Sequence, residues 1–172
     1  MKRLAVIAIA ILAVGCGEDP AAPSQTPAVP TFTAALLPAN ENPPVTGPEA
    51  AGSGSVNFTI DITRDAAQTI TAATFNFTVN LTGFPANTPI NLAHIHVGGA
   101  TANGGVVVNL GLAAGQVSLA NGSGGFTRTI AQPAASLSIV NDILNNPGGH
   151  YFNVHSSNFP GGVARGQLVR TQ

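Results

Sequence analysis

The chain has few of the residues that cross-link small proteins or bind polyanions. Its 172 residues include a single cysteine, so no disulfide can form within the chain. Tryptophan is absent, tyrosine occurs once, and charged residues make up only 8% of the sequence. The one lysine, Lys2, stands near the N-terminus, and the arginines are scattered. Without a basic patch, nucleic-acid binding and charge-driven binding to anionic lipid are both disfavoured.

What remains is rich in glycine, threonine, asparagine, alanine and valine, which favours short strands joined by tight turns. A domain of about 140 residues buries enough apolar surface to fold without cross-links. We therefore predict an all-β fold over residues 31–172, a Greek-key-like antiparallel β-sandwich or barrel with one short helix. A signal peptide and a disordered tether are expected to precede it.

The first residues have the pattern of a targeting segment. Two basic residues precede an apolar run over 4–14, which is too short to span a membrane and suits a signal peptide. Residues 13–16, Ala-Val-Gly-Cys, resemble a bacterial lipobox, with alanine where leucine is more usual. We expect residues 1–15 to be a lipoprotein signal peptide and Cys16 to carry the lipid. The alternative is an ordinary signal peptide with an incidental thiol.

Residues 16–30 are polar and proline-rich, a composition that forms extended segments without a core. We expect this stretch to be a lipidated tether that holds the domain off the membrane. Gly17 stands where an aspartate would resemble an inner-membrane retention signal. The outer membrane or the cell surface is therefore the expected location in the bacterial cell envelope, with the membrane as a partner through the lipid. No motif identifies a protein or glycan partner.

Hydrophobic periodicity predicts the order of the elements. The stretches 56–63 and 74–81 alternate strictly between apolar and polar residues, as half-buried antiparallel strands do. Apolar residues at helical spacing between Pro133 and Pro147 predict a short helix across one end of the sandwich. Further strands are predicted over 31–37, 92–98, 106–110, 116–119, 125–131, 150–155 and 163–170.

All four histidines of the chain lie in two of these predicted strands. Side chains alternate along an extended strand, so His94 and His96 share one face while Ile95 lies on the other. In the second strand, the same alternation places Phe152 and Val154 on the apolar face. Its polar face holds Tyr151, Asn153 and His155.

Two interpretations of the histidines remain open. As ligands, His94, His96 and His155 would form a three-nitrogen site suited to copper or zinc, with His150 less favoured. As a structural network, the histidines would hydrogen-bond to Glu41, Arg165 and loop backbone. The sequence makes no cofactor certain, and copper or zinc would suit the histidines best.

Two further expectations depend on these interpretations. A metal ligand needs its second ring nitrogen held, here by Asn153, Tyr151 or a carbonyl group. Glu41 stands in an otherwise uncharged loop and is either a solvated carboxylate or a partner for an arginine.

Four motifs stand in order along the chain: Asn40-Glu41-Asn42-Pro43-Pro44-Val45, Ala93-His94-Ile95-His96-Val97-Gly98, Tyr151-Phe152-Asn153-Val154-His155-Ser156 and Pro160-Gly161-Gly162-Val163-Ala164-Arg165-Gly166-Gln167-Leu168. Together they resemble the CHRD domain, the module named after chordin, over about residues 32–169. The family usually has an acidic residue where Val163 and Ala164 stand here, although Arg165 is present. The resemblance implies an extracellular β-sandwich without an established catalytic activity.

A fainter likeness is to the copper/zinc superoxide dismutase sandwich, which also has a His-x-His strand and a later Gly-Gly-His, here 148–150. That family has a structural disulfide and a larger ligand set bridging two metals, which this chain lacks. No serine lies in a Gly-x-Ser-x-Gly elbow, and no pair of carboxylates is placed for glycoside hydrolysis. The sequence therefore predicts a binding module rather than an enzyme.

Overall fold

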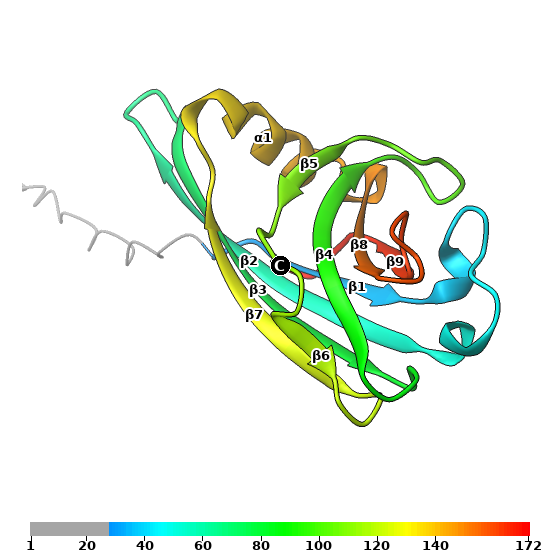
Figure 1. Ribbon diagram of the computed structural model, residues 1–172. Coiled ribbons are helices and arrows are strands. Elements are labelled where there is room, and N and C mark those ends of the chain that lie inside the picture. The colour runs from blue at the N-terminus through cyan, green and yellow to red at the C-terminus, as the bar shows by residue number, and fades with distance from the viewer. Residues whose placement is uncertain (1–27) are drawn as a thin grey trace, which may run out of the picture.

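Two packed β-sheets form the domain (Figure 1). The computed structural model describes residues 28–172, and the predicted signal peptide and most of the tether lie outside these residues. One sheet contains, in spatial order, β10 (Val169–Arg170), β1 (Thr31–Leu36), β2 (Ser53–Arg64), β3 (Ile70–Thr82) and β7 (Gly124–Ala131). The other contains β5 (Val106–Asn109), β4 (Thr88–Val97), β8 (His150–Ser156) and β9 (Ala164–Gln167), with β6 (Val117–Leu119) also paired to β4.

Every strand pair is antiparallel, which confirms the predicted all-β sandwich. The alternating residues of β2 and β3 place their phenylalanines between the sheets, where Phe77 meets Phe152 of β8 with ring centroids 5.9 Å apart. Each fully buried phenylalanine contributes about 1.5–3 kcal/mol through removal of apolar surface from water. Because Phe152 and Val154 of β8 are held in this core, the polar side chains that alternate with them point away from it.

The one α-helix of residues 28–172, α1 (Leu137–Asn145), lies at the end of the sandwich that holds the β2–β3 turn (Figure 1). Val140 and Ile143 are its buried residues, and they join the main core. The apolar residues of this stretch repeat with the helical period, and the structure confirms the short helix that this spacing predicts. Within residues 28–172, no helix has the length and apolar character needed to cross a membrane.

The closing stretch differs from the prediction of one strand over 163–170. It forms β9 and β10, which belong to different sheets. Between them Leu168 is buried, and its backbone N–H donates to the carbonyl of His150. The chain therefore passes from the edge of one sheet to the edge of the other at this residue, and a bridge between Leu37 and Arg165 joins the two edges.

Four short 3-10 segments complete the connections within the described part of the chain. They are η1 (Pro38–Asn40), η2 (Pro48–Ala51), η3 (Ala134–Ser136) and η4 (Pro147–Gly149). The loop that contains η1 and η2 lies beside the β4–β5 loop (Figure 1). Asn42 donates its side-chain amide to the carbonyl of Thr101 at 2.9 Å, and Asn103 donates to the carbonyl of Asn42 at 2.6 Å. These contacts join the two loops beside the polar face of β8.

Candidate metal centre

Strands β4 and β8 place three histidines on one face of their sheet. In the antiparallel register, His94 lies opposite Asn153, His96 opposite Tyr151, and Leu92 opposite His155. The two-residue period of a strand sends these polar side chains away from the core, while Ile95, Phe152 and Val154 point into it. The predicted faces of both strands are therefore confirmed.

The three imidazoles form a tight cluster that loops cover. One ring nitrogen from each of His94, His96 and His155 can be chosen so that all three atoms lie within 4.8 Å of one another. The ring centroids of His94 and His155 are 4.9 Å apart, and those of His94 and His96 are 5.5 Å apart. The side chains are only 7%, 8% and 5% exposed, in sequence order. The cluster is thus inside the protein, although it lies outside the apolar core.

Two backbone carbonyls fix the protonation of these rings. His96 Nδ1 lies 2.9 Å from the carbonyl oxygen of Gly104, and His155 Nδ1 lies 2.9 Å from that of Pro160. A carbonyl oxygen can only accept, so each Nδ1 carries the proton and each neutral ring has a lone pair at Nε2. His94 Nδ1, 3.1 Å from His155 Nε2, must then be the donor of that bond. His96 Nε2 is buried and has no partner among the described residues.

Burial keeps the cluster neutral. It lowers the pKa of His94 to about 4, and the neighbouring His155 and His96 act in the same direction. The pKa values of His96 and His155 are also lowered, chiefly by burial, although their carbonyl partners oppose that shift. The uncharged imidazole is the form in which histidine binds a metal ion, and His96 Nε2 presents its lone pair without a competing donor.

Tyr151 and Arg165 form a stack on one side of the cluster. The Tyr151 ring lies parallel to the His96 ring, with centroids 4.9 Å apart and 6° between the planes. The guanidinium carbon of Arg165 lies 4.6 Å from the centre of the Tyr151 ring. Arg165 is only 2% exposed, so a buried positive charge stands one aromatic ring away from a candidate ligand.

Glu41 lies beside the cluster and is buried, not solvated. It is 7% exposed, and burial raises its pKa to about 7, against the lowering effects of Arg165 and of a hydrogen bond from Asn153. Within residues 28–172 no oxygen of Glu41 lies within 4.0 Å of an Arg165 nitrogen, so the two do not form an ion pair. Glu41 Oε1 and Asn153 Oδ1 have no hydrogen-bond partner among the described residues.

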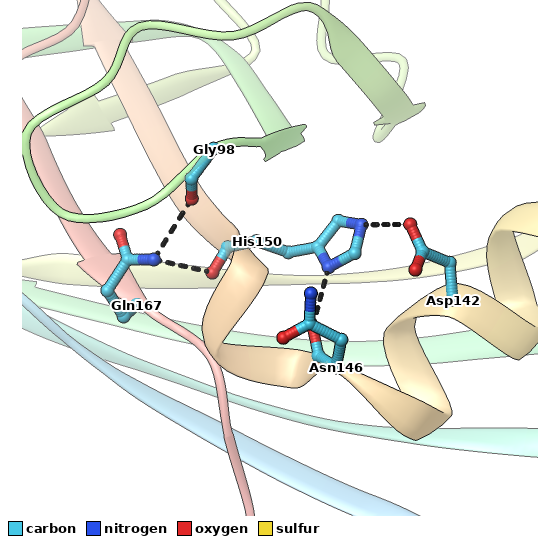
Figure 2. Close-up of polar contacts among 5 residues, drawn as sticks. All are labelled: Gly98, Asp142, Asn146, His150 and Gln167. Carbon is cyan, nitrogen blue, oxygen red and sulfur yellow. Dashed lines mark hydrogen bonds and ion pairs between the residues drawn. The ribbon is translucent and has the colours of Figure 1, made fainter.

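His150 lies apart from the other three histidines. Figure 2 shows its ring turned toward α1 and the turn that follows it, where Nδ1 donates to the carbonyl of Asn146 at 3.0 Å. Its Nε2 lies 3.3 Å from a carboxylate oxygen of Asp142. The backbone carbonyl of the same residue accepts from the side-chain amide of Gln167 at 3.2 Å, and that amide also reaches Gly98. His150 thus ties the helix end to β8.

Sequence reasoning did not identify several partners of the cluster. The histidines bond to loop backbone, as expected, but among the described residues none bonds to Glu41 or Arg165. The carbonyls of Gly104 and Pro160 were not singled out, because no side chain marks a backbone acceptor. Gly162 was also missed: a Cβ there would lie 2.5 Å from Asn153 Nδ2 and 2.7 Å from Glu41 Oε2. Its place in the Pro160-Gly161-Gly162 run of the fourth motif was the available signal.

Comparison with known proteins agrees with the motifs. The family model described as CHRD domain matches residues 32–168, which is most of the chain. No curated protein and no solved structure matches it. The family model spans both histidine strands, the Glu41 loop and the closing strand with Arg165. The chain therefore belongs to the CHRD domain family.

Proposed function

We propose that this chain is a lipid-anchored, non-catalytic binding module of the cell envelope that holds one copper or zinc ion at His94, His96 and His155. The observation that carries the metal site is the buried lone pair of His96 Nε2. A buried acceptor without a donor costs about 1–3 kcal/mol, and a metal ion at this position would remove that cost. Two other imidazole nitrogens stand beside it, and imidazole suits both metals.

The cluster needs little movement to bind an ion. With metal–nitrogen distances of about 2.0–2.1 Å, two ligand atoms on one ion lie no more than about 4.2 Å apart. The three nitrogens lie within 4.8 Å of one another, so small ring rotations would close the site once the metal replaces the hydrogen bond from His94 to His155. Gly104 and Pro160 already hold the second nitrogens of two ligands, as carbonyl groups do around metal-bound histidine.

A structural role is the second candidate, and the same hydrogen bonds favour it. His96 binds the β4–β5 loop through Gly104, and His155 binds the loop after β8 through Pro160. The His94–His155 bond links the two strands across the polar face. In this case the module would recognise a protein or glycan partner with its loops, and the histidines would order those loops.

Metal analysis of the full-length chain without a histidine tag separates these candidates. We expect one equivalent of copper or zinc in the wild type and its loss in the double variant His94→Ala/His96→Ala. His150→Gln is the matched control, because it removes an imidazole outside the cluster and should retain the metal. If the wild type binds no metal and the double variant only lowers the melting temperature, the structural role holds.

The proposed anchor is supported by the lipobox-like residues 13–16 and the tether that follows. A Cys16→Ser chain expressed in a bacterium should lose its lipid, which the mass of the mature protein measures. It should also move from the detergent phase to the aqueous phase on phase separation, because two or more acyl chains dominate the partitioning. An unchanged mass and distribution would contradict lipidation at Cys16.

A further inference from the structure

The cluster faces a buried cation, Arg165, that no carboxylate among residues 28–172 neutralises by contact. The donors of Arg165 are taken by neutral oxygens: the carbonyls of Asn40, Ala100 and Ala102 and the side chain of Asn103, at 2.6 to 3.1 Å. Among residues 28–172 the only carboxylate within 4.0 Å of a basic side chain is that of Asp142, beside His150. No contacting carboxylate among these residues therefore offsets the positive charge of Arg165, which lies over the Tyr151 ring. That charge lowers the pKa of His96.

In mildly acidic solution the buried acids near this face do not cancel that charge. Glu41 is the acid close enough to Arg165 to interact with it, and burial holds its pKa near 7, so it is mostly neutral in mildly acidic solution. Glu49 accepts hydrogen bonds from Ser156 at 2.6 Å and Asn158 at 2.7 Å. Ser156 is one residue beyond His155, and the alternation of β8 therefore directs its side chain to the opposite face.

We propose that the three-histidine site holds copper in the cuprous state, in preference to divalent ions. This inference rests on the metal-binding function proposed above and names the ion. The three neutral imidazoles contribute no negative charge, so below the pKa of Glu41 each positive charge on the ion is opposed by Arg165 without compensation. Three converging nitrogens also suit Cu(I), whereas Cu(II) favours a tetragonal arrangement with more ligands.

The size of the charge effect follows from the stack. The guanidinium lies 4.6 Å from the Tyr151 ring and that ring lies 4.9 Å from the His96 ring, so the charge is at most about 10 Å from the ligand. At an effective dielectric constant of about 20, repulsion over this separation lowers the binding constant of the ion on the order of tenfold for each unit of its positive charge. Removal of the Arg165 charge should therefore strengthen Cu(II) binding about tenfold relative to Cu(I).

The midpoint potential of the bound copper measures this ratio directly. We would load the full-length chain with copper and titrate it at pH 6, where Glu41 is mostly neutral. For a one-electron couple, a tenfold change in relative affinity is about 59 mV. Arg165→Gln should lower the potential by about that amount. Arg165→Lys, which keeps the charge, and Arg64→Gln, which removes an exposed charge from β2 in the other sheet, should leave it close to the wild-type value.

Each outcome decides a different claim. A wild-type chain that binds no copper refutes the metal-binding function itself. A chain that binds copper but shows equal potentials in Arg165→Gln and the wild type, or an equal decrease in Arg165→Gln and Arg165→Lys, overturns the charge argument alone. If Arg165→Gln does not fold, Asn153→Asp tests the same idea by adding a negative charge opposite His94, and its potential should also fall. An unchanged or higher potential in that variant overturns the inference.

Discussion

Glu41 gives a sharp test of the electrostatics beside the cluster. Burial raises its pKa from the ordinary 4.5 to about 7 in the folded chain, although Arg165 and Asn153 oppose the shift. Below pH 4.5 the carboxyl is protonated in both the folded and the unfolded chain. Between pH 4.5 and 7 the unfolded chain loses this proton first, so the contribution of Glu41 to the free energy of unfolding falls as pH rises.

The expected magnitude follows from the shift. One pKa unit corresponds to about 1.36 kcal/mol, so ionising Glu41 inside the folded protein costs about 3 kcal/mol at pH 8 relative to pH 4. Glu41→Gln is neutral at every pH and is close in shape, and its amide oxygen can still accept from Asn153. We therefore expect equal stabilities at pH 4 and a variant more stable than the wild type by up to about 3 kcal/mol at pH 8.

Urea denaturation of the metal-free chain at pH 4, 6 and 8 measures the difference. Glu49→Gln is the matched control, because Glu49 is a buried acid whose carboxylate accepts bonds from Ser156 and Asn158. It should lose stability at pH 8, by roughly 1–3 kcal/mol, since a charge-assisted acceptor is removed. A Glu41→Gln chain less stable than the wild type at pH 8 would refute the reasoning, because it would mean that attraction to Arg165 outweighs the cost of burial.

The histidines give the same experiment a second readout. The folded pKa of His94 is about 4, below its ordinary 6.5, so the unfolded chain takes up this proton first as pH falls. As pH falls from 6.5 to 4, the contribution of His94 to the free energy of unfolding therefore decreases, whereas that of Glu41 increases. The Glu41→Gln chain lacks the opposing contribution, and its stability should fall more steeply toward acid than that of the wild type.

Three further substitutions test other parts of the structure. Gly162→Ala should destabilise the chain by about 1–3 kcal/mol, because φ is +139° and the new Cβ would meet Asn153 and Glu41; thermal unfolding that matches the wild type would contradict the close approach. Ser156→Ala should cost about 1–3 kcal/mol in urea, since buried Glu49 loses a donor, and a neutral effect would indicate that Asn158 alone suffices. Arg165→Met should cost more than about 3 kcal/mol, because several carbonyls lose their donor together, and a change below 1 kcal/mol would place the guanidinium in solvent.

The sequence was sufficient for the strands and for the faces that they present. Side-chain direction in a strand depends only on odd and even position, so Phe58 and Phe77 could be assigned to the core before any pairing was known. The same rule separates His150 from His155, which are five positions apart and must lie on opposite faces if the strand is regular. The structure shows this separation, with His150 against α1 and His155 in the cluster.

The loops could not be predicted in the same way. Whether the polar face of β8 is open or covered depends on contacts between segments far apart in the chain, such as Asn42 with Thr101 and Arg165 with Ala100. No local period encodes those contacts. For this reason Glu41 could be interpreted as a solvated carboxylate or as an arginine partner. The structure shows a third arrangement, in which it is buried near Arg165 without an ion pair.

Arg165 links the closing strand to the orientation of a candidate ligand. Its guanidinium holds the carbonyls of Ala100 and Ala102, and the same loop supplies the Gly104 carbonyl that fixes the tautomer of His96. Gly104 is also required there, since a Cβ would overlap the carbonyl of Val97, and its N–H donates to the Tyr151 hydroxyl at 3.2 Å. One buried arginine therefore both orders the loop that prepares His96 and supplies the charge that opposes a divalent ion. The Arg165→Lys chain separates these two effects, because lysine keeps the charge but cannot reproduce the planar set of donors.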